Sequence, residues 1–208
     1  MTDTDGMIDR LSPNFDARTL PVSMAVLHYT GMVDAASAID RLADPDAKVS
    51  AHYVVAEDGQ IIRMVDEANR AWHAGRSWWR GISDVNSASI GIEIVNPGHE
   101  FGYRPFPEAQ IDSVIQLLGG IVRRHGITRG NVVGHSDVAP ARKEDPGELF
   151  PWQRLAEAGI GLWPQKREPG LGAEALVRFG YDPGAPQERG DSQIHGRGSQ
   201  SQSQCLPS

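Results

Sequence analysis

The stretch SIGIEIVN, residues 89–96, alternates strictly between two kinds of side chain. Its three isoleucines fall on one face of an extended chain, whereas Gly91 and Glu93 fall on the other, because successive side chains of a β-strand point to opposite sides. The isoleucine face predicts a strand that packs on a hydrophobic core. The other face is either the solvent side of a half-exposed sheet or the border of a cleft at which Glu93 is aimed.

Several segments on both sides of this strand carry the signals of regular secondary structure. Strands are predicted for the apolar run MAVLHYT, for the two halves of a hairpin around Asp58-Gly59, and for NVVG (24–30, 51–65 and 131–134). Helices are predicted after the N-cap candidate Asp34, across an amphipathic stretch, and across PWQRLAEAGI (35–44, 107–126 and 151–160). This mixture over residues 24–163 predicts one α/β domain with a central mixed β-sheet flanked by helices.

The chain divides into four parts in this interpretation. Residues 1–21 are polar and form an N-terminal arm, and residues 22–164 hold the domain. GAEALVRFG, within residues 165–183, predicts one more short helix. Residues 184–208 are rich in Gln, Ser, Gly and charge, with too few apolar side chains to offset the entropy lost on ordering, so we expect them to be disordered.

The composition excludes several classes of protein. The chain has 208 residues, a formal net charge of −7 and no cluster of Lys and Arg, which argues against nucleic acid or an anionic membrane as its main partner. No apolar run is long enough to insert into a membrane. The single cysteine, Cys205, excludes an internal disulfide and a cysteine-based zinc site. Any metal is therefore expected to be held by histidines and carboxylates.

Three residues form a candidate metal site. His28 interrupts an apolar strand, His135 follows the NVVG strand, and Asp145 lies in the irregular, charged stretch HSDVAPARKEDPGELFPW. For His28 alone, a core histidine with satisfied hydrogen bonds is the simpler reading. Two histidines and one carboxylate are nevertheless a sufficient ligand set for zinc, and they leave its fourth position open for water, as in catalytic sites.

Two charged residues lie where they would serve such a site. Lys143 precedes Asp145 by two residues; a loop lysine is usually only solvated, but beside a metal it stabilises the oxyanion formed by attack on a carbonyl. Glu93 is a candidate general base, unless it simply faces solvent. Three other histidines, His99, His125 and His195, are expected to be solvated.

Five motifs carry a resemblance to a known family. LHYT, SAHY, AWHAG, SIGIEIVN and VGHSDVAPARKEDPGELFPW, in this order across residues 20–163, resemble the zinc-dependent N-acetylmuramoyl-L-alanine amidases of the AmpD/AmiD type. That family shares its fold with phage lysozyme-like amidases and peptidoglycan recognition proteins. The resemblance therefore implies a peptidoglycan-recognition/amidase-like fold.

The resemblance also assigns roles to individual residues. It implies that Zn²⁺ is held by His28, His135 and Asp145, and that Glu93 and Lys143 are the catalytic residues. Positions in the AWHAG motif fall where members of the family line the substrate cleft, which implies that substrate is bound by Trp72 and His73. His52, in SAHY, is expected to support the site without binding the metal.

The activity implied is hydrolysis of the amide between N-acetylmuramic or anhydro-muramic acid and L-alanine of peptidoglycan stem peptides. The expected partners are thus peptidoglycan fragments or murein, in cell-wall turnover or recycling. One alternative is a binding module of the same fold without activity, which the presence of every ligand and catalytic position disfavours. Another is a phage-type endolysin amidase, which shares the chemistry.

Two further expectations concern the ends of the chain. Residues 1–18 lack the basic start and apolar core of a secretory signal, so we expect a cytoplasmic enzyme; a misplaced start codon would hide a leader and place it in the envelope. Larger relatives continue into a small helical module that binds cell wall. LVRFGYDP resembles the start of that module, which makes residues 165–183 its expected remnant.

Overall fold

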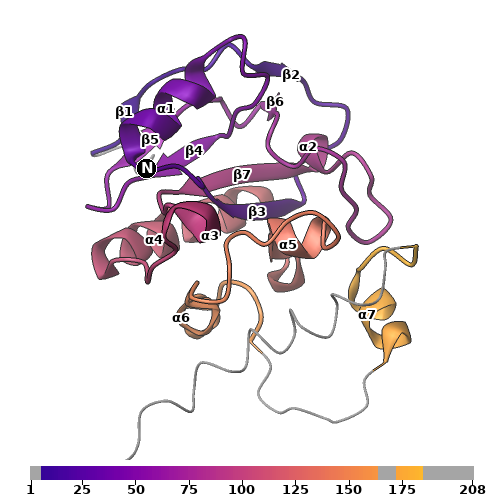
Figure 1. Ribbon diagram of the computed structural model, residues 1–208. Coiled ribbons are helices and arrows are strands. Elements are labelled where there is room, and N and C mark those ends of the chain that lie inside the picture. Colours follow the sequence, from indigo (N-terminus) through magenta and orange to yellow (C-terminus); the bar gives the residue numbers. More distant parts are fainter. Residues whose placement is uncertain (1–5, 164–171, 185–208) are drawn as a thin grey trace, which may run out of the picture.

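The computed structural model of the protein describes residues 6–163 and 172–184. Its centre is a six-stranded sheet in which β4 and β5 are antiparallel and all other neighbours are parallel (Figure 1). From edge to edge the strands are β1 (Ile8–Asp9), β5 (Ile61–Arg63), β4 (Tyr53–Val55), β7 (Ser89–Ile94), β3 (Met24–Tyr29) and β8 (Val132–Gly134). The predicted mixed sheet is confirmed, and the predicted hairpin is the β4–β5 pair.

The two faces of the sheet are covered by different helices. Ile90, Ile92 and Ile94 of β7 are fully buried against α4 (Glu108–His125), so the isoleucine face is confirmed as the main core face. α1 (Ala35–Ala43) covers the opposite face, where Leu42 packs with Val54. The layers are visible in Figure 1, in which α1 and α4 lie on opposite sides of the strands.

The helix ends follow the predicted local chemistry. The Asp34 carboxylate accepts a hydrogen bond of 2.8 Å from the backbone N–H of Ser37 and so caps α1. Gly126 ends α4 in the left-handed conformation, with φ +64°, which glycine adopts without a steric penalty. The remaining helices are short: α2 (Val85–Ala88), α3 (Gly98–Phe101), η1 (Arg129–Asn131), α5 (His135–Val138), α6 (Trp152–Glu157) and α7 (Ala173–Phe179).

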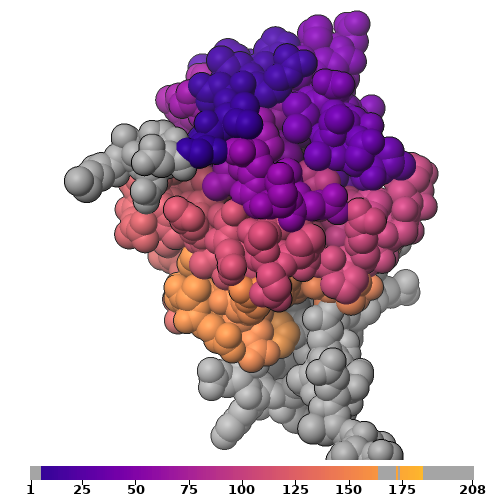
Figure 2. Space-filling model, turned by 90° about the vertical axis from the view of Figure 1, so that its left-hand side faces the viewer, coloured from indigo at the N-terminus to yellow at the C-terminus, as the bar shows by residue number. Residues whose placement is uncertain are grey.

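Two segments differ from the sequence-based description. The stretch from His135 was expected to have no regular structure, but its first four residues form α5, with the Asp137 carboxylate accepting a hydrogen bond from the backbone N–H of Gly134. The N-terminal arm is not simply a polar extension. It supplies β1 to the main sheet and β2 (Phe15–Ala17), which pairs antiparallel with β6 (Asn69–Ala71). Figure 2 shows these N-terminal residues covering one end of the molecule.

Residues 172–184 pack on the domain. Tyr181 is buried, its ring lies 5.2 Å from that of Trp79, and the backbone N–H of Arg80 donates to the Gly180 carbonyl at 2.8 Å. The predicted helix in GAEALVRFG is confirmed as α7; that it is the remnant of a cell-wall-binding module stays a prediction. The predicted disorder of the tail concerns residues 184–208, of which residues 185–208 lie outside the described part of the chain.

Membrane insertion was not expected from the sequence. Within residues 6–163 and 172–184, none of the helices combines the length and the apolar character that crossing a bilayer requires.

Candidate metal centre

His28, His135 and Asp145 meet at one point. Nδ1 of His28 lies 2.9 Å from Nδ1 of His135, and Oδ2 of Asp145 lies 3.0 Å and 3.1 Å from these two nitrogens. All three residues are buried. Strand register explains the meeting of the histidines. β3 and β8 are parallel neighbours with Leu27 opposite Gly134, so the next residue of each chain segment emerges at the same edge of the sheet.

The loop that carries Asp145 is tied back to both sides of the site. The backbone N–H of Ser136 donates to the Asp145 carbonyl at 2.9 Å. The Tyr103 hydroxyl donates to the Pro146 carbonyl at 2.8 Å and accepts from the backbone N–H of Leu149 at 3.0 Å. These bonds hold the carboxylate beside the histidines although the loop has little regular structure.

The protonation states of the cluster suit a metal ion. Burial, and then the neighbouring His135, lower the pKa of His28 to about 4, so its imidazole is neutral at pH 7. Burial would raise the pKa of Asp145, but hydrogen bonds with His135 and His28 outweigh it and hold that pKa below its ordinary value. A neutral imidazole and an ionised carboxylate are the forms in which these side chains bind metals.

Glu93 lies next to the cluster and has an incomplete set of partners. It stands opposite His28 in the parallel pair of β3 and β7, and its Oε2 atom is buried without a hydrogen-bond partner. Burial raises the pKa of Glu93 well above its ordinary value, and the charge of Asp145 adds to the effect, whereas Lys143 opposes it. A buried carboxylate oxygen that no protein group satisfies is suited to a water or a substrate.

A cleft of about 630 Å³ opens over these residues. It is lined from β3, α1, the AWHAG segment and the loop before Asp145. All seven residues singled out from the sequence line it: His28, Trp72, His73, Glu93, His135, Lys143 and Asp145. The structure therefore brings together side chains that span almost 120 residues of sequence.

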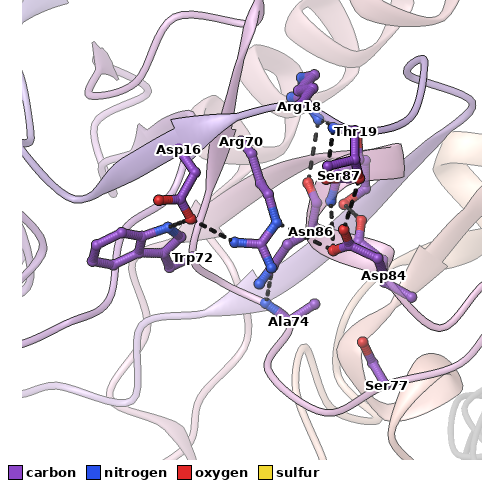
Figure 3. Close-up of polar contacts among 12 residues, drawn as sticks. Asp16, Arg18, Thr19, Arg70, Trp72, Ala74, Ser77, Asp84, Asn86 and Ser87 are labelled. Atoms are coloured by element: carbon purple, nitrogen blue, oxygen red, sulfur yellow. Dashed lines mark hydrogen bonds and ion pairs between the residues drawn. The ribbon is translucent and has the colours of Figure 1, made fainter.

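The two residues of the AWHAG motif have different surroundings. The indole N–H of Trp72 donates to Asp16 at 2.7 Å, so the N-terminal arm holds this wall of the cleft (Figure 3). Nδ1 of His73 lies 3.1 Å from Nε2 of His28, and its ring rests on Gly91. On the face of β7 that carries Glu93, the space over Gly91 is therefore occupied by the His73 ring.

Other contacts agree with or correct the expectations for the histidines. His52 lies outside the candidate metal-binding group, and its Nδ1 accepts a hydrogen bond from the Gly91 backbone N–H at 2.9 Å; its supporting role stays a prediction. His125 was expected to be solvated, but it lies 2.6 Å from Glu67 and is half-buried. The sequence did not predict this contact, because Glu67 lies far from His125 along the chain.

Two residues near the site were missed. Arg142 donates to the carbonyls of Ala74 and Arg76 and so ties the AWHAG segment to the Lys143 loop. Asn86 accepts from the backbone N–H groups of His73 and Ala74 with its side-chain oxygen. Arg142 could have been suspected from the sequence because it directly precedes Lys143, whereas no sequence pattern indicated a role for Asn86.

The mixed sheet, the three converging donors and the unpaired carboxylate together define a hydrolase built around a candidate metal centre. The model of the N-acetylmuramoyl-L-alanine amidase family, Amidase_2, matches residues 18–148. The chain belongs to this family of enzymes, as its motifs implied.

Individual relatives agree with this assignment. The chain is 40% identical over 188 residues to the N-acetylmuramoyl-L-alanine amidase AmiD of Escherichia coli K12, which covers 77% of this chain and 67% of the relative. It is 35% identical over 163 residues to the 1,6-anhydro-N-acetylmuramyl-L-alanine amidase AmpD of Haemophilus influenzae, covering 69% and 86%. The structure of the E. coli AmiD complex with anhydro-N-acetylmuramic acid-L-Ala-D-γ-Glu-L-Lys is similar with a TM-score of 0.69 and 39% identity, covering 80% of this chain and 75% of that one.

Proposed function

We propose that this protein is a zinc-dependent amidase that cleaves the amide between N-acetylmuramic acid, or its anhydro form, and L-alanine of peptidoglycan stem peptides. The observation that carries the proposal is the buried, unpaired oxygen of Glu93 beside the His28, His135 and Asp145 donors. A relative acts on anhydro-muramyl-L-alanine, as its name states, and the E. coli AmiD structure holds such a peptide as substrate. Both support the same substrate class here.

The donor set favours zinc among the common metals. Two imidazole nitrogens and one carboxylate oxygen are the ligands of many catalytic zinc sites, whereas magnesium and calcium prefer oxygen ligands alone. His28, His135 and Asp145 would hold the ion. When bound, zinc supplies Lewis acidity, which acidifies water and polarises a carbonyl group.

The protein's own side chains provide the remaining chemistry. Glu93 accepts the proton of the attacking water with its free Oε2 and delivers it to the nitrogen of L-alanine, which leaves as an amine. Lys143 lines the same cleft and stabilises the negative charge that develops on the carbonyl oxygen, a contribution of about 3 kcal/mol for a typical oxyanion donor. The amide bond breaks, and the muramyl carboxylate and the free peptide are the products.

Product analysis by mass spectrometry tests the proposal. Purified protein is incubated with anhydro-muramyl tripeptide, after chelation, and after add-back of zinc, with magnesium as the matched control. We expect free tripeptide to appear, to stop on chelation and to return with zinc alone. If the zinc-loaded protein cleaves neither this fragment nor intact murein sacculi, the proposed activity is wrong and the protein is a peptidoglycan-binding module instead.

The cytoplasmic location stays a prediction. Fractionation of the native host followed by immunoblotting decides it: an enzyme of fragment recycling is expected in the cytoplasmic fraction, whereas recovery with the envelope would assign it to turnover of the intact wall.

A further inference from the structure

Both metal-binding histidines find their second partner on the same dipeptide. Nε2 of His28 lies 3.1 Å from Nδ1 of His73, and Nε2 of His135 lies 3.1 Å from the carbonyl oxygen of Ala74. An imidazole that offers Nδ1 to a metal carries its proton on Nε2, and that N–H group needs an acceptor when it is buried. His73–Ala74 supplies one acceptor to each histidine.

The neighbours of His73 determine which of its nitrogens accepts. Nε2 of His73 lies 3.2 Å from the hydroxyl of Ser89, and this hydroxyl donates its single proton to the Val85 carbonyl at 2.5 Å. The Ser89 oxygen is thus left to accept from Nε2–H of His73. Nδ1 of His73 then carries no proton, which makes it the acceptor that His28 requires.

The dipeptide itself is anchored by one buried side chain. The side-chain oxygen of Asn86 accepts from the backbone N–H of His73 at 3.1 Å and from that of Ala74 at 2.8 Å. Asn86 is 7% exposed, and Arg18 in turn donates to its backbone carbonyl at 3.2 Å. Figure 3 shows Asn86 between Ala74 and Arg18.

The position of the His73 ring also requires a glycine beneath it, at residue 91. A Cβ atom built on Gly91 would lie 2.4 Å from that ring, closer than real contacts allow. Strand β7 therefore admits the imidazole only because residue 91 has no side chain.

We propose that Asn86 and the dipeptide His73–Ala74 form a positioning clamp that orients the imidazoles of His28 and His135 for metal binding. The inference rests on the proposed zinc-dependent function, and it makes His73 a positioning residue as well as a wall of the cleft. Asn86 acts only through the dipeptide.

A matched pair of substitutions at His73 tests the clamp. His73→Asn keeps an acceptor oxygen close to the place of Nδ1, whereas His73→Leu fills similar space without one. Zinc affinity is measured by competition with a chromogenic chelator. We expect His73→Leu to weaken zinc binding by about 10- to 100-fold, the usual cost of losing such a partner, and His73→Asn to retain most of the affinity. Equal, unchanged affinity in both variants would overturn the proposal.

A second pair of substitutions, at Asn86, tests the anchoring of the dipeptide separately. Asn86→Asp preserves the accepting oxygen and Asn86→Leu removes it; thermal unfolding of the metal-free proteins reports whether each is folded. We expect a folded Asn86→Leu protein to bind zinc more weakly than Asn86→Asp. If Asn86→Leu does not fold, the His73 pair decides. If the unsubstituted protein fails to bind zinc, the proposed function fails; if it binds zinc and all four variants match it, the clamp alone fails.

Discussion

Asp145 and Glu93 are carboxylates in one cleft with opposite shifts in pKa. Two histidines contact Oδ2 of Asp145 and keep it ionised, whereas Oε2 of Glu93 is buried with no donor, so burial raises its pKa. When the surroundings of two carboxylates shift their pKa values in opposite directions, the two groups are suited to different chemical roles. Asp145 is suited to hold a cation permanently, and Glu93 is suited to exchange a proton.

The same two carboxylates give the first prediction. Asp145→Ala is expected to lose both zinc and hydrolysis, because it removes a metal-binding atom. Glu93→Ala is expected to keep zinc and to lose hydrolysis by about 10²- to 10⁴-fold, the usual contribution of a general base. Metal content by elemental analysis and product release by mass spectrometry check both. Zinc missing from Glu93→Ala, or full activity of zinc-loaded Asp145→Ala, would reverse the assignments.

Lys143 gives a second prediction, because only its charge is proposed to act. Lys143→Met keeps the length of the side chain and removes the ammonium. We expect kcat to fall by about 10²-fold with zinc content unchanged, the typical loss for one oxyanion donor. Lys143→Arg serves as the control that keeps the charge. Equal kcat for Lys143→Met and the unsubstituted protein would remove Lys143 from the mechanism.

Helix α4 is attached to the sheet by more than apolar packing. The carboxylate of Glu67, between β5 and β6, accepts from the Tyr53 hydroxyl at 2.8 Å and from Arg124 at 2.6 Å, and lies 2.6 Å from His125. Burial opposes ionisation of this carboxylate, but its bonds to Arg124, His125 and Tyr53 outweigh burial and lower its pKa to about 2. Glu67 thus joins the C-terminal end of α4 to β4.

This attachment is expected to depend on acid. A carboxylate with an ordinary pKa of 4.5 and a folded-state pKa of about 2 stabilises the fold above pH 4.5, and the contribution disappears as pH falls toward 2. We expect Glu67→Gln to lower the free energy of unfolding by about 2 kcal/mol at pH 7 and by much less at pH 3. Urea unfolding at both values measures this. Glu100→Gln, at an exposed position on α3, is the control, and a loss at pH 3 as large as at pH 7 would contradict the linkage.

Residues near both ends of the described chain contact residues of the cleft or of the candidate metal centre. From the N-terminal side, Asp16 holds Trp72 and also pairs with Arg70 at 2.9 Å (Figure 3). From the C-terminal side, the Tyr181 hydroxyl donates to Asp137 at 2.5 Å, and Asp137 caps the turn that begins at His135. Segments that the sequence assigns to the periphery therefore support the wall of the cleft at Trp72 and the turn that carries His135 of the candidate metal centre.

Removal of the C-terminal segment is expected to destabilise the whole domain. Deleting residues 172–208 uncovers Trp79, which is fully buried, and removes Tyr181, one of the hydrogen-bond partners of Asp137. We expect the Tm to fall by about 5 °C or more, since about 2 kcal/mol corresponds to that shift in a domain of this size. Differential scanning fluorimetry measures it. Deleting only residues 185–208 is the control, because it leaves α7 and Tyr181 in place; equal Tm values for the two deletions would show that the segment contributes nothing.

Local sequence patterns predicted most of the elements and the residues that line the site. The isoleucine alternation of β7, the apolar spacing of α4 and the Asp58-Gly59 turn are each encoded within a few residues, because they depend on backbone geometry and on which face is buried. The ordered motifs likewise indicated His28, His135, Asp145, Glu93 and Lys143, because each lies in a short, recognisable stretch.

Only the tertiary structure decided how these residues are supported. The bond between His28 and His73, the anchoring of His73–Ala74 by Asn86 and the burial of Tyr181 join segments that are far apart in sequence. Such contacts have no periodicity and depend on register between strands and on distances of a few tenths of an ångström. The sequence by itself therefore predicted which side chains surround the candidate metal centre, and the fold decided which of their atoms meet, because hydrogen bonds form only between groups that packing has already brought together.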